Sequence, residues 1–295
     1  MKIQRLRSEC INCLAKRNMN TYPENTPEEK KLEYTKRVLQ ILLDAADDEG
    51  APIIVGRITA LRAEMFGITD EYSEIKTYYN DLLLKKEDEL FSSLESSPDP
   101  LRQALQYALV GNYIDFGALD SVDDEKLWAL IKTAGDLPLS DAEYTHLQKD
   151  LSSGKKLVYL TDNCGEIVLD KLLIRLLRSL YPALEITVIV KSSYVLNDVT
   201  MDDALQVALT DYARVIGNGN NTSGTWLEAL SEEASAAIDT ADLIIAKGQA
   251  NYETLRYCGK NIYYLFLCKC QMLAKDCNVP LMTGMFINDR RIPSA

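Results

Sequence analysis

The sequence predicts an α/β protein in which a doubly wound, mostly parallel sheet follows an all-helical N-terminal region. Before residue 150, apolar residues recur at helical spacing and runs of β-branched residues are absent. After residue 154, short apolar runs alternate with amphipathic stretches. Strands separated by helices pair in parallel through right-handed crossovers. We therefore expect a helical domain at residues 1–152 and an α/β domain at residues 153–295.

The helical half begins with a charged amphipathic stretch at residues 28–47, in which Leu32, Val38 and Leu42 fall at helical spacing. The same pattern predicts helices at residues 57–66, 72–95, 100–110, 126–134 and 141–151. The run Ser-Ser-Pro-Asp-Pro at residues 96–100 interrupts it, and Pro100 suits the first turn of the helix that follows.

The second half begins with a compact apolar run at residues 156–161. Similar runs at residues 185–190, 214–216, 243–246 and 262–267 predict further strands. Between these runs we expect helices at residues 165–181, about 201–209 and 225–238, and others beginning near residues 251 and 269. This alternation requires helices on both faces of the sheet.

The composition argues against several classes of partner. The chain has 295 residues and a net charge of −12, so electrostatic binding of nucleic acid or an anionic membrane is not expected. No window approaches the roughly 20 apolar residues that span a bilayer. Seven cysteines, an odd number in a long chain, suit a reducing cytosol, so we expect a cytoplasmic protein. The sequence leaves the oligomeric state open.

Polar residues gather where the predicted strands end. In an open parallel sheet, ligands bind beyond the carboxyl ends of the strands. Four successive strand ends carry carboxylates, amides, a lysine and glycines: Asp162, Asn163 and Glu166; Ser192, Asn197 and Asp198; the loop 217–224; and Lys247, Gly248 and Asn251. We expect this edge of the sheet to hold the functional site.

Asp162, Asn163 and Asp198 supply the hard oxygen atoms that Mg²⁺ and Mn²⁺ prefer. Asp162 and Asn163 are adjacent at a turn from strand to helix, and Asp198 follows the neighbouring strand. Each residue taken alone is as well explained as a helix cap. Taken together at adjacent strand ends, they favour a metal site that leaves positions for water and a phosphate.

Lys247 ends a predicted strand, so its ammonium could meet a phosphate from a fixed direction, although an isolated lysine is more often solvated. The loop 217–224 lacks the complete dinucleotide fingerprint, and no Walker pattern is present. Its backbone N–H groups could still hold a phosphate.

The cysteines give a weaker signal. Cys10 and Cys13 form a C-x-x-C and Cys268 and Cys270 a C-x-C, and a zinc site would require these distant pairs to meet. Two small apolar residues on one helix face explain Cys10 and Cys13 more simply, and we expect both to be dispensable for chemistry. His146 is the only histidine, which leaves little support for a Ser-His-Asp triad.

These motifs together resemble the damage-control phosphatase family, a family of metal-dependent phosphatases. The resemblance covers nearly the whole chain and rests on several short segments: Thr161 to Glu166 with Asp170; Leu196 to Ala204; Lys247 to Glu253; Asp70, Tyr72, Lys76 and Asn80; and Gly111, Asn112 and Asp115. Cys10 and Cys13 are similar to an N-terminal pair in its prokaryotic branch. Cys164 and Ala250 depart from the family pattern, but both are small.

The resemblance implies an α/β/α sandwich with a helical N-terminal region and a divalent cation (Mn, Mg, Co or Ni) at the carboxyl edge of the sheet. It implies that Asp162, Asn163 and Asp198 hold the cation and that Asp162 and Lys247 serve catalysis. Residues expected near the substrate are Asn112, Asp115, Glu166, Ser192, Asn197, Asn251 and Glu253. The implied substrates are small phosphometabolites, namely sugar phosphates or damaged phosphorylated metabolites.

Three alternatives remain at this point. Asp162 could form an aspartyl-phosphate, but residue 164 is Cys and the D-x-D pattern is absent, so in-line attack by water assisted by the metal is preferred. A similar α/β sheet also serves S-adenosylmethionine-dependent methyltransferases of small molecules. The third alternative is a non-catalytic metabolite-binding protein.

Overall fold

The computed structural model describes residues 5–115 and 122–292. Within these residues, six strands form one sheet with the order β3-β2-β1-β4-β5-β6. Their bounds are β1 (Lys156–Leu160), β2 (Glu185–Val190), β3 (Arg214–Gly217), β4 (Leu243–Lys247), β5 (Ile262–Leu267) and β6 (Gly284–Asn288).

The sheet is mostly parallel, as the sequence predicts. Strands β1 to β5 pair in parallel, and only β6 runs antiparallel, against β5. The chain winds outward from β1 to β3 and then returns to the other side of β1 with β4. Strands β1 and β4 are therefore the switch point, beyond whose carboxyl ends a crevice forms in such sheets.

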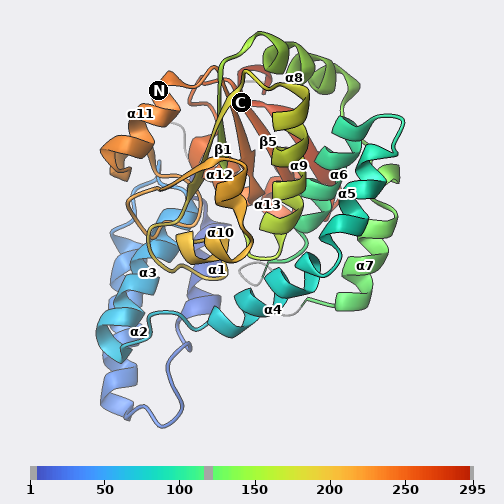
Figure 1. Cartoon of the computed structure of the whole chain (residues 1–295). Coiled ribbons are helices and arrows are strands. Elements are labelled where there is room, and N and C mark those ends of the chain that lie inside the picture. Colours follow the sequence, from blue (N-terminus) through green and yellow to red (C-terminus); the bar gives the residue numbers. More distant parts are fainter. Residues whose placement is uncertain (1–4, 116–121, 293–295) are drawn as a thin grey trace.

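Helices cover both faces of the sheet, and two separate apolar cores lie between the layers. One face carries α4 (Ser73–Leu84), α5 (Glu87–Glu95), α6 (Pro100–Gly111), α7 (Asp124–Lys132), α8 (Asp141–Ser153), α9 (Glu166–Leu180) and α10 (Met201–Gln206). The other carries α1 (Ser8–Asn18), α2 (Glu28–Leu43), α3 (Ala51–Phe66), α11 (Glu232–Thr240), α12 (Gly248–Leu255) and α13 (Gln271–Asp276). In Figure 1, α5–α7 and α1–α3 accordingly lie on opposite sides of the molecule.

The observed elements differ from the predicted ones at a few boundaries and by one additional strand. The stretch 72–95 forms two helices, α4 and α5, because the chain turns at Lys85 and Lys86. Three acidic residues then begin α5, where negative charge is favourable next to the positive end of the helix dipole. Strand β6 was not predicted, since residues 284–288 show no clear strand pattern. Helix α6 begins at Pro100 as expected, and the Asp99 carboxylate caps it by accepting from the Arg102 N–H.

Both halves of the chain contribute to both cores. The last helix of the N-terminal half ends at Ser153 and the first strand begins at Lys156, close to the predicted boundary. Whether the helical half is a domain of its own stays a prediction. No helix among the described residues is both long enough and apolar enough to cross a membrane.

Candidate active site

The ends of β1 and β2 meet through backbone hydrogen bonds, which bring the three predicted metal ligands together. The Val199 N–H donates to the Asp162 carbonyl at 2.8 Å, and the Cys164 N–H donates to the Asn197 carbonyl at 2.9 Å. Asn163 and Asp198 consequently face each other as an isolated antiparallel bridge. Side chains that are 35 residues apart in sequence thus share one site.

Asp162 is held in a fixed orientation by two amides. Its Oδ2 accepts from Asn112 Nδ2 at 2.8 Å and from Asn163 Nδ2 at 2.6 Å. Gly248 passes close by with φ +79°, and a Cβ at that position would lie 2.0 Å from Asp162 Oδ2. Only glycine allows β4 to end so close to this carboxylate.

Asn163 lies between two carboxylates. Its Nδ2 also donates to Glu166 Oε2 at 3.1 Å, and its backbone N–H donates to the same oxygen at 3.2 Å. An amide binds a metal through its oxygen. The amide nitrogen of Asn163 therefore orients the carboxylates, and its Oδ1 is the atom suited to a cation.

Asp198 has one oxygen without a hydrogen bond. The residue is 2% exposed, and its Oδ1 accepts from Ser223 Oγ at 3.3 Å. Within the described part of the chain, its Oδ2 has no hydrogen-bond partner, and Lys191 Nζ lies 3.7 Å away. A buried carboxylate oxygen without a partner is costly unless a cation compensates it.

Burial and mutual repulsion act on these carboxylates. Desolvation, followed by the charges of Glu166, Asp198 and Asp115, raises the pKa of Asp162 well above its usual value. Desolvation likewise raises the pKa of Asp198 to about 7, although Lys191 opposes the shift. A divalent cation would relieve this repulsion, so the residues present fit such an ion. Among the described residues, no three His, Cys, Asp or Glu side chains form a metal cluster. The candidate set instead combines two carboxylates with an amide, which leaves room for water and a phosphate.

Lys247 donates to protein groups, and its catalytic role stays a prediction. It is fully buried, and its Nζ donates to the Ala108 carbonyl at 2.8 Å, to Asp170 Oδ1 at 2.8 Å and to Glu166 Oε1. All three N–H groups are thereby used by acceptors on α6 and α9. Burial alone would lower the pKa of Lys247, but Asp170 and Glu166 raise it above its usual value. The lysine is held as a cation that neutralises these two carboxylates.

Two other lysines also lie near the predicted ligands. Lys191 follows β2, is 4% exposed and donates to the Gly224 carbonyl at 2.6 Å. Lys269 follows β5, and its Nζ donates to Asp115 Oδ2 at 2.7 Å. The charge of Lys269 lowers the pKa of Asp162 against the larger effect of burial. Lys269 was not singled out in the sequence because it lies between two cysteines, although its place after a strand was a usable signal.

The residues predicted near the substrate occupy different positions. Asn112, Asn197 and Asn251 are fully buried and bond to protein atoms, with the Asn112 Oδ1 accepting from the Leu267 N–H at 3.0 Å. Asn197 donates to the Ile114 carbonyl, and Asn251 donates to the carbonyls of Thr161 and Lys247. These amides hold the loops of the site together, and their contact with a substrate stays a prediction.

Helix α12 supports the loop that carries Lys269. Gln249 Oε1 accepts from the backbone N–H groups of Lys269 and Cys270 at 2.9 and 3.1 Å. Gln249 Nε2 in turn donates to Glu253 Oε1 at 2.7 Å. Glu253 therefore lies behind Gln249, where it helps to fix the position of Lys269.

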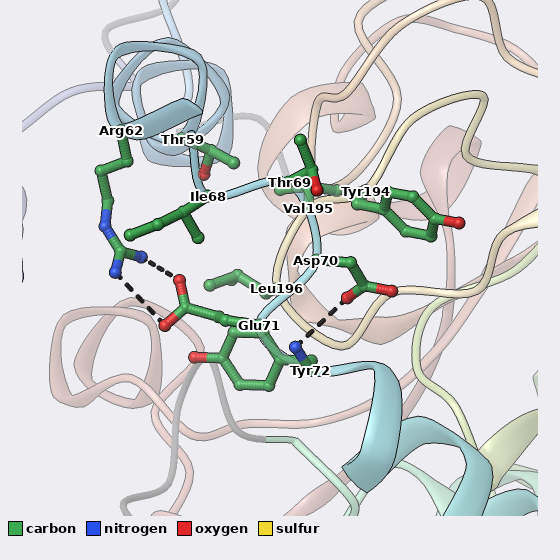
Figure 2. A pocket seen from close by; sticks show the side chains of 10 residues that line it. All are labelled: Thr59, Arg62, Ile68, Thr69, Asp70, Glu71, Tyr72, Tyr194, Val195 and Leu196. Carbon is green, nitrogen blue, oxygen red and sulfur yellow. Dashed lines mark hydrogen bonds and ion pairs between the residues drawn. The ribbon is translucent and has the colours of Figure 1, made fainter. Parts of the chain in front are cut away.

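Two hollows lie along the loop between β2 and Asp198. One is lined by Ser192 together with Lys191, Ser193, Tyr194, Thr200, Met201, Asp202 and Gly217. Figure 2 shows the other, between α3 and this loop, where Arg62 pairs with Glu71 and the Asp70 carboxylate accepts from the Tyr72 N–H. Tyr194 lines both, so the loop that leads to the predicted ligand Asp198 borders two hollows.

Cys10 and Cys13 lie on α1, whereas Cys268 and Cys270 flank Lys269. Cys10 lies on the buried face of α1, with its Sγ 3.7 Å from Met272 Sδ, whereas Cys13 is exposed. Cys268 is buried at the end of β5 and Cys270 precedes α13. The described cysteines are all free thiols and do not gather as a zinc site.

This chain is similar in sequence to a known protein domain and to two damage-control phosphatases. Residues 6–284 match the damage-control phosphatase ARMT1-like domain. A damage-control phosphatase from Archaeoglobus fulgidus is 34% identical over 221 residues, which cover 73% of this chain and 75% of that protein. One from Pyrococcus horikoshii is 28% identical over 288 residues, covering 95% of this chain and 96% of that protein.

The fold agrees with a solved structure. The crystal structure of a DUF89 family protein from Pyrococcus horikoshii superposes with a TM-score of 0.80 at 25% sequence identity. The superposition covers 96% of this chain and 99% of the other. This match includes both the helical half and the sheet.

Proposed function

Since the chain belongs to the ARMT1-like damage-control phosphatase family, whose members are metabolite-repair phosphatases, we propose that it hydrolyses small phosphate monoesters with the help of a divalent cation. The proposed cation is Mn²⁺, Mg²⁺, Co²⁺ or Ni²⁺, and its proposed ligands are Asp162, Asn163 and Asp198. The proposed substrates are sugar phosphates or damaged phosphorylated metabolites.

The observation that carries the metal requirement is the buried carboxylate pair. Asp162 and Asp198 are 4% and 2% exposed, and Asp198 Oδ2 lacks a hydrogen-bond partner among the described residues. When bound, a divalent cation supplies a Lewis acid that neutralises phosphoryl oxygens and lowers the pKa of a water. The carboxylates bind it, and the amides of Asn112 and Asn163 keep Asp162 oriented.

The positive charge for the phosphoryl group is best supplied by Lys269, with Lys191 on the other side of Asp162. Both follow strand ends, and both influence the pKa values of the carboxylates at the site. Lys247 is proposed instead to neutralise the charges of Glu166 and Asp170, because its three N–H groups already donate to protein acceptors. Direct attack by water is preferred over an aspartyl-phosphate, since the D-x-D pattern is absent and Asp162 is proposed to bind the cation.

A phosphatase assay with and without EDTA tests this proposal. We expect hydrolysis of a sugar phosphate to stop when EDTA strips the metal and to return when Mn²⁺ or Mg²⁺ is added, because the carboxylates alone cannot neutralise a phosphate. Undiminished hydrolysis after exhaustive EDTA treatment would contradict metal dependence. Binding of S-adenosylmethionine without hydrolysis would favour the methyltransferase alternative, and metabolite binding with no turnover would favour a binding protein.

Lys269→Ala is expected to reduce kcat by about 100- to 1,000-fold, which is typical of removing one donor that stabilises transition-state charge. Steady-state kinetics on a sugar phosphate at saturating Mn²⁺ measure the effect. Lys275→Ala is the matched control, because Lys275 is an exposed lysine on α13. Equal kinetics in both variants would remove Lys269 from the site.

A further inference from the structure

Helix α4 is hydrogen-bonded to the loop that carries Asp162 and Asn163. The contact is made by Asn80, which is fully buried. Its Oδ1 accepts from the Gly165 N–H at 2.6 Å. Gly165 comes two residues after Asn163 and directly precedes α9. An amide of the helical half therefore fixes the turn from which two of the proposed metal ligands project.

The fit between α4 and this turn is close. Gly165 has φ +67°, and a Cβ there would lie 2.9 Å from the Cβ of Tyr79 and 2.8 Å from Ile114 Cδ1. Glycine is required by both the backbone conformation and the space. The turn cannot move toward α4, and its N–H has the Asn80 side chain as a buried acceptor.

The other end of the same amide reaches the loop after β2. Asn80 Nδ2 donates to Asp203 Oδ1 at 3.1 Å and to Gln206 Oε1 at 2.8 Å. Asp203 Oδ2 accepts from the Thr200 N–H and the Thr200 hydroxyl, both at 2.8 Å. Thr200 lies two residues after Asp198, so the chain of hydrogen bonds runs from one ligand loop to the other through Asn80.

Lys76, one turn earlier on α4, completes the connection. Its Nζ lies 2.7 Å from Asp203 Oδ2 and 3.4 Å from Thr200 Oγ1, and both side chains of the ion pair are about 95% buried. This ion pair holds the Asp203 carboxylate in place as the cap of α10. Helix α4 thus holds the Asp198 loop by an ion pair and the Asp162 loop by an amide.

We propose that Asn80 is a positioning residue that sets the affinity of the site for its cation by fixing the spacing of the two ligand loops. The proposal rests on the metal site proposed above. With so few protein ligands, the site depends on their spacing being fixed before the cation arrives. Removing the amide frees the Gly165 turn to move relative to Thr200, and part of the binding free energy is then spent on ordering the loops.

The test is the dissociation constant for Mn²⁺, measured by isothermal titration calorimetry on the metal-stripped protein. Asn80→Ala is expected to weaken binding by about 10- to 100-fold, the range typical of residues that orient metal ligands. Leu83→Ala is the matched control, since Leu83 is a fully buried residue of the same helix that packs in the core. It should lower stability but keep the wild-type dissociation constant.

The outcomes separate this proposal from the proposed function. If the wild-type protein binds Mn²⁺ and Asn80→Ala binds it equally well, the positioning role is wrong while the metal site stands. Equal weakening in Leu83→Ala also overturns it, because the effect would then be one of general stability. A wild-type protein that does not bind Mn²⁺ overturns both proposals. Should Asn80→Ala not fold, Asn80→Ser is judged by the same criteria, since its short side chain cannot bridge Gly165 and Asp203.

Discussion

Asp162→Ala is expected to lower turnover of a phosphate monoester by at least about a thousandfold while the protein stays folded. The variant removes one of two carboxylates from a site with few other protein ligands. Folding should not suffer, because burial and neighbouring carboxylates already raise the pKa of Asp162 and make its charge unfavourable. Steady-state kinetics and a thermal melt of the metal-stripped protein measure the two effects.

The matched control for this prediction is Asp242→Ala. Asp242 is exposed at the opposite end of β1, where its Oδ2 accepts from the N–H groups of Lys155 and Lys156. This variant should keep wild-type turnover. Retained activity in Asp162→Ala would remove the carboxylate from the mechanism, and an unfolded variant would show that Asp162 has a structural role.

Lys247→Met is expected to lower the free energy of unfolding by about 3–5 kcal/mol, the usual result of removing one partner from a buried ion pair. Methionine fills the space but leaves Glu166 and Asp170 without their cation. Turnover should fall as well, because Glu166 accepts hydrogen bonds from both Asn163 and Asn112 and its repulsion of Asp162 would increase. Urea denaturation and kinetics give the two values.

Lys171→Met is the control that distinguishes an effect on stability from an effect on catalysis. Lys171 lies on the same helix α9, forms a buried ion pair with Glu87 and donates to the Val207 carbonyl. Its loss should destabilise the protein and leave kcat unchanged in the folded fraction. If Lys247→Met behaves in the same way, the lysine has only a structural role.

The alternation of strands and helices could be predicted because each buried strand is a continuous apolar run, such as residues 185–190 and 262–267, and both are confirmed at these bounds. Strand β6 could not be predicted in this way, because an edge strand that pairs only with β5 does not need a continuous apolar run. The division between α4 and α5 is set by a turn at Lys85 and Lys86, residues that also favour helices.

The position of the site could be predicted from the sequence, but the direction of some of its side chains could not. Strand order places Asp162 and Asp198 at one edge, and the rule that ligands bind there requires no knowledge of side-chain direction. The direction of Lys247 depends on tertiary partners, Glu166 and Asp170, which lie about 80 residues away and form an ion-pair network below the sheet edge. Lys269 reaches the site through a loop whose position depends on Gln249, a contact that no local pattern indicates.

The central claim is that a divalent cation binds between the loops that follow β1 and β2. Anomalous diffraction from a crystal of the protein soaked in Mn²⁺ tests it most directly. The account predicts one strong peak about 2 Å from oxygen atoms of Asp162, Asn163 and Asp198, the distance usual for a small divalent cation. A peak elsewhere, for example beside Cys10 and Cys13, or no peak at the sheet edge at saturating Mn²⁺, would contradict it.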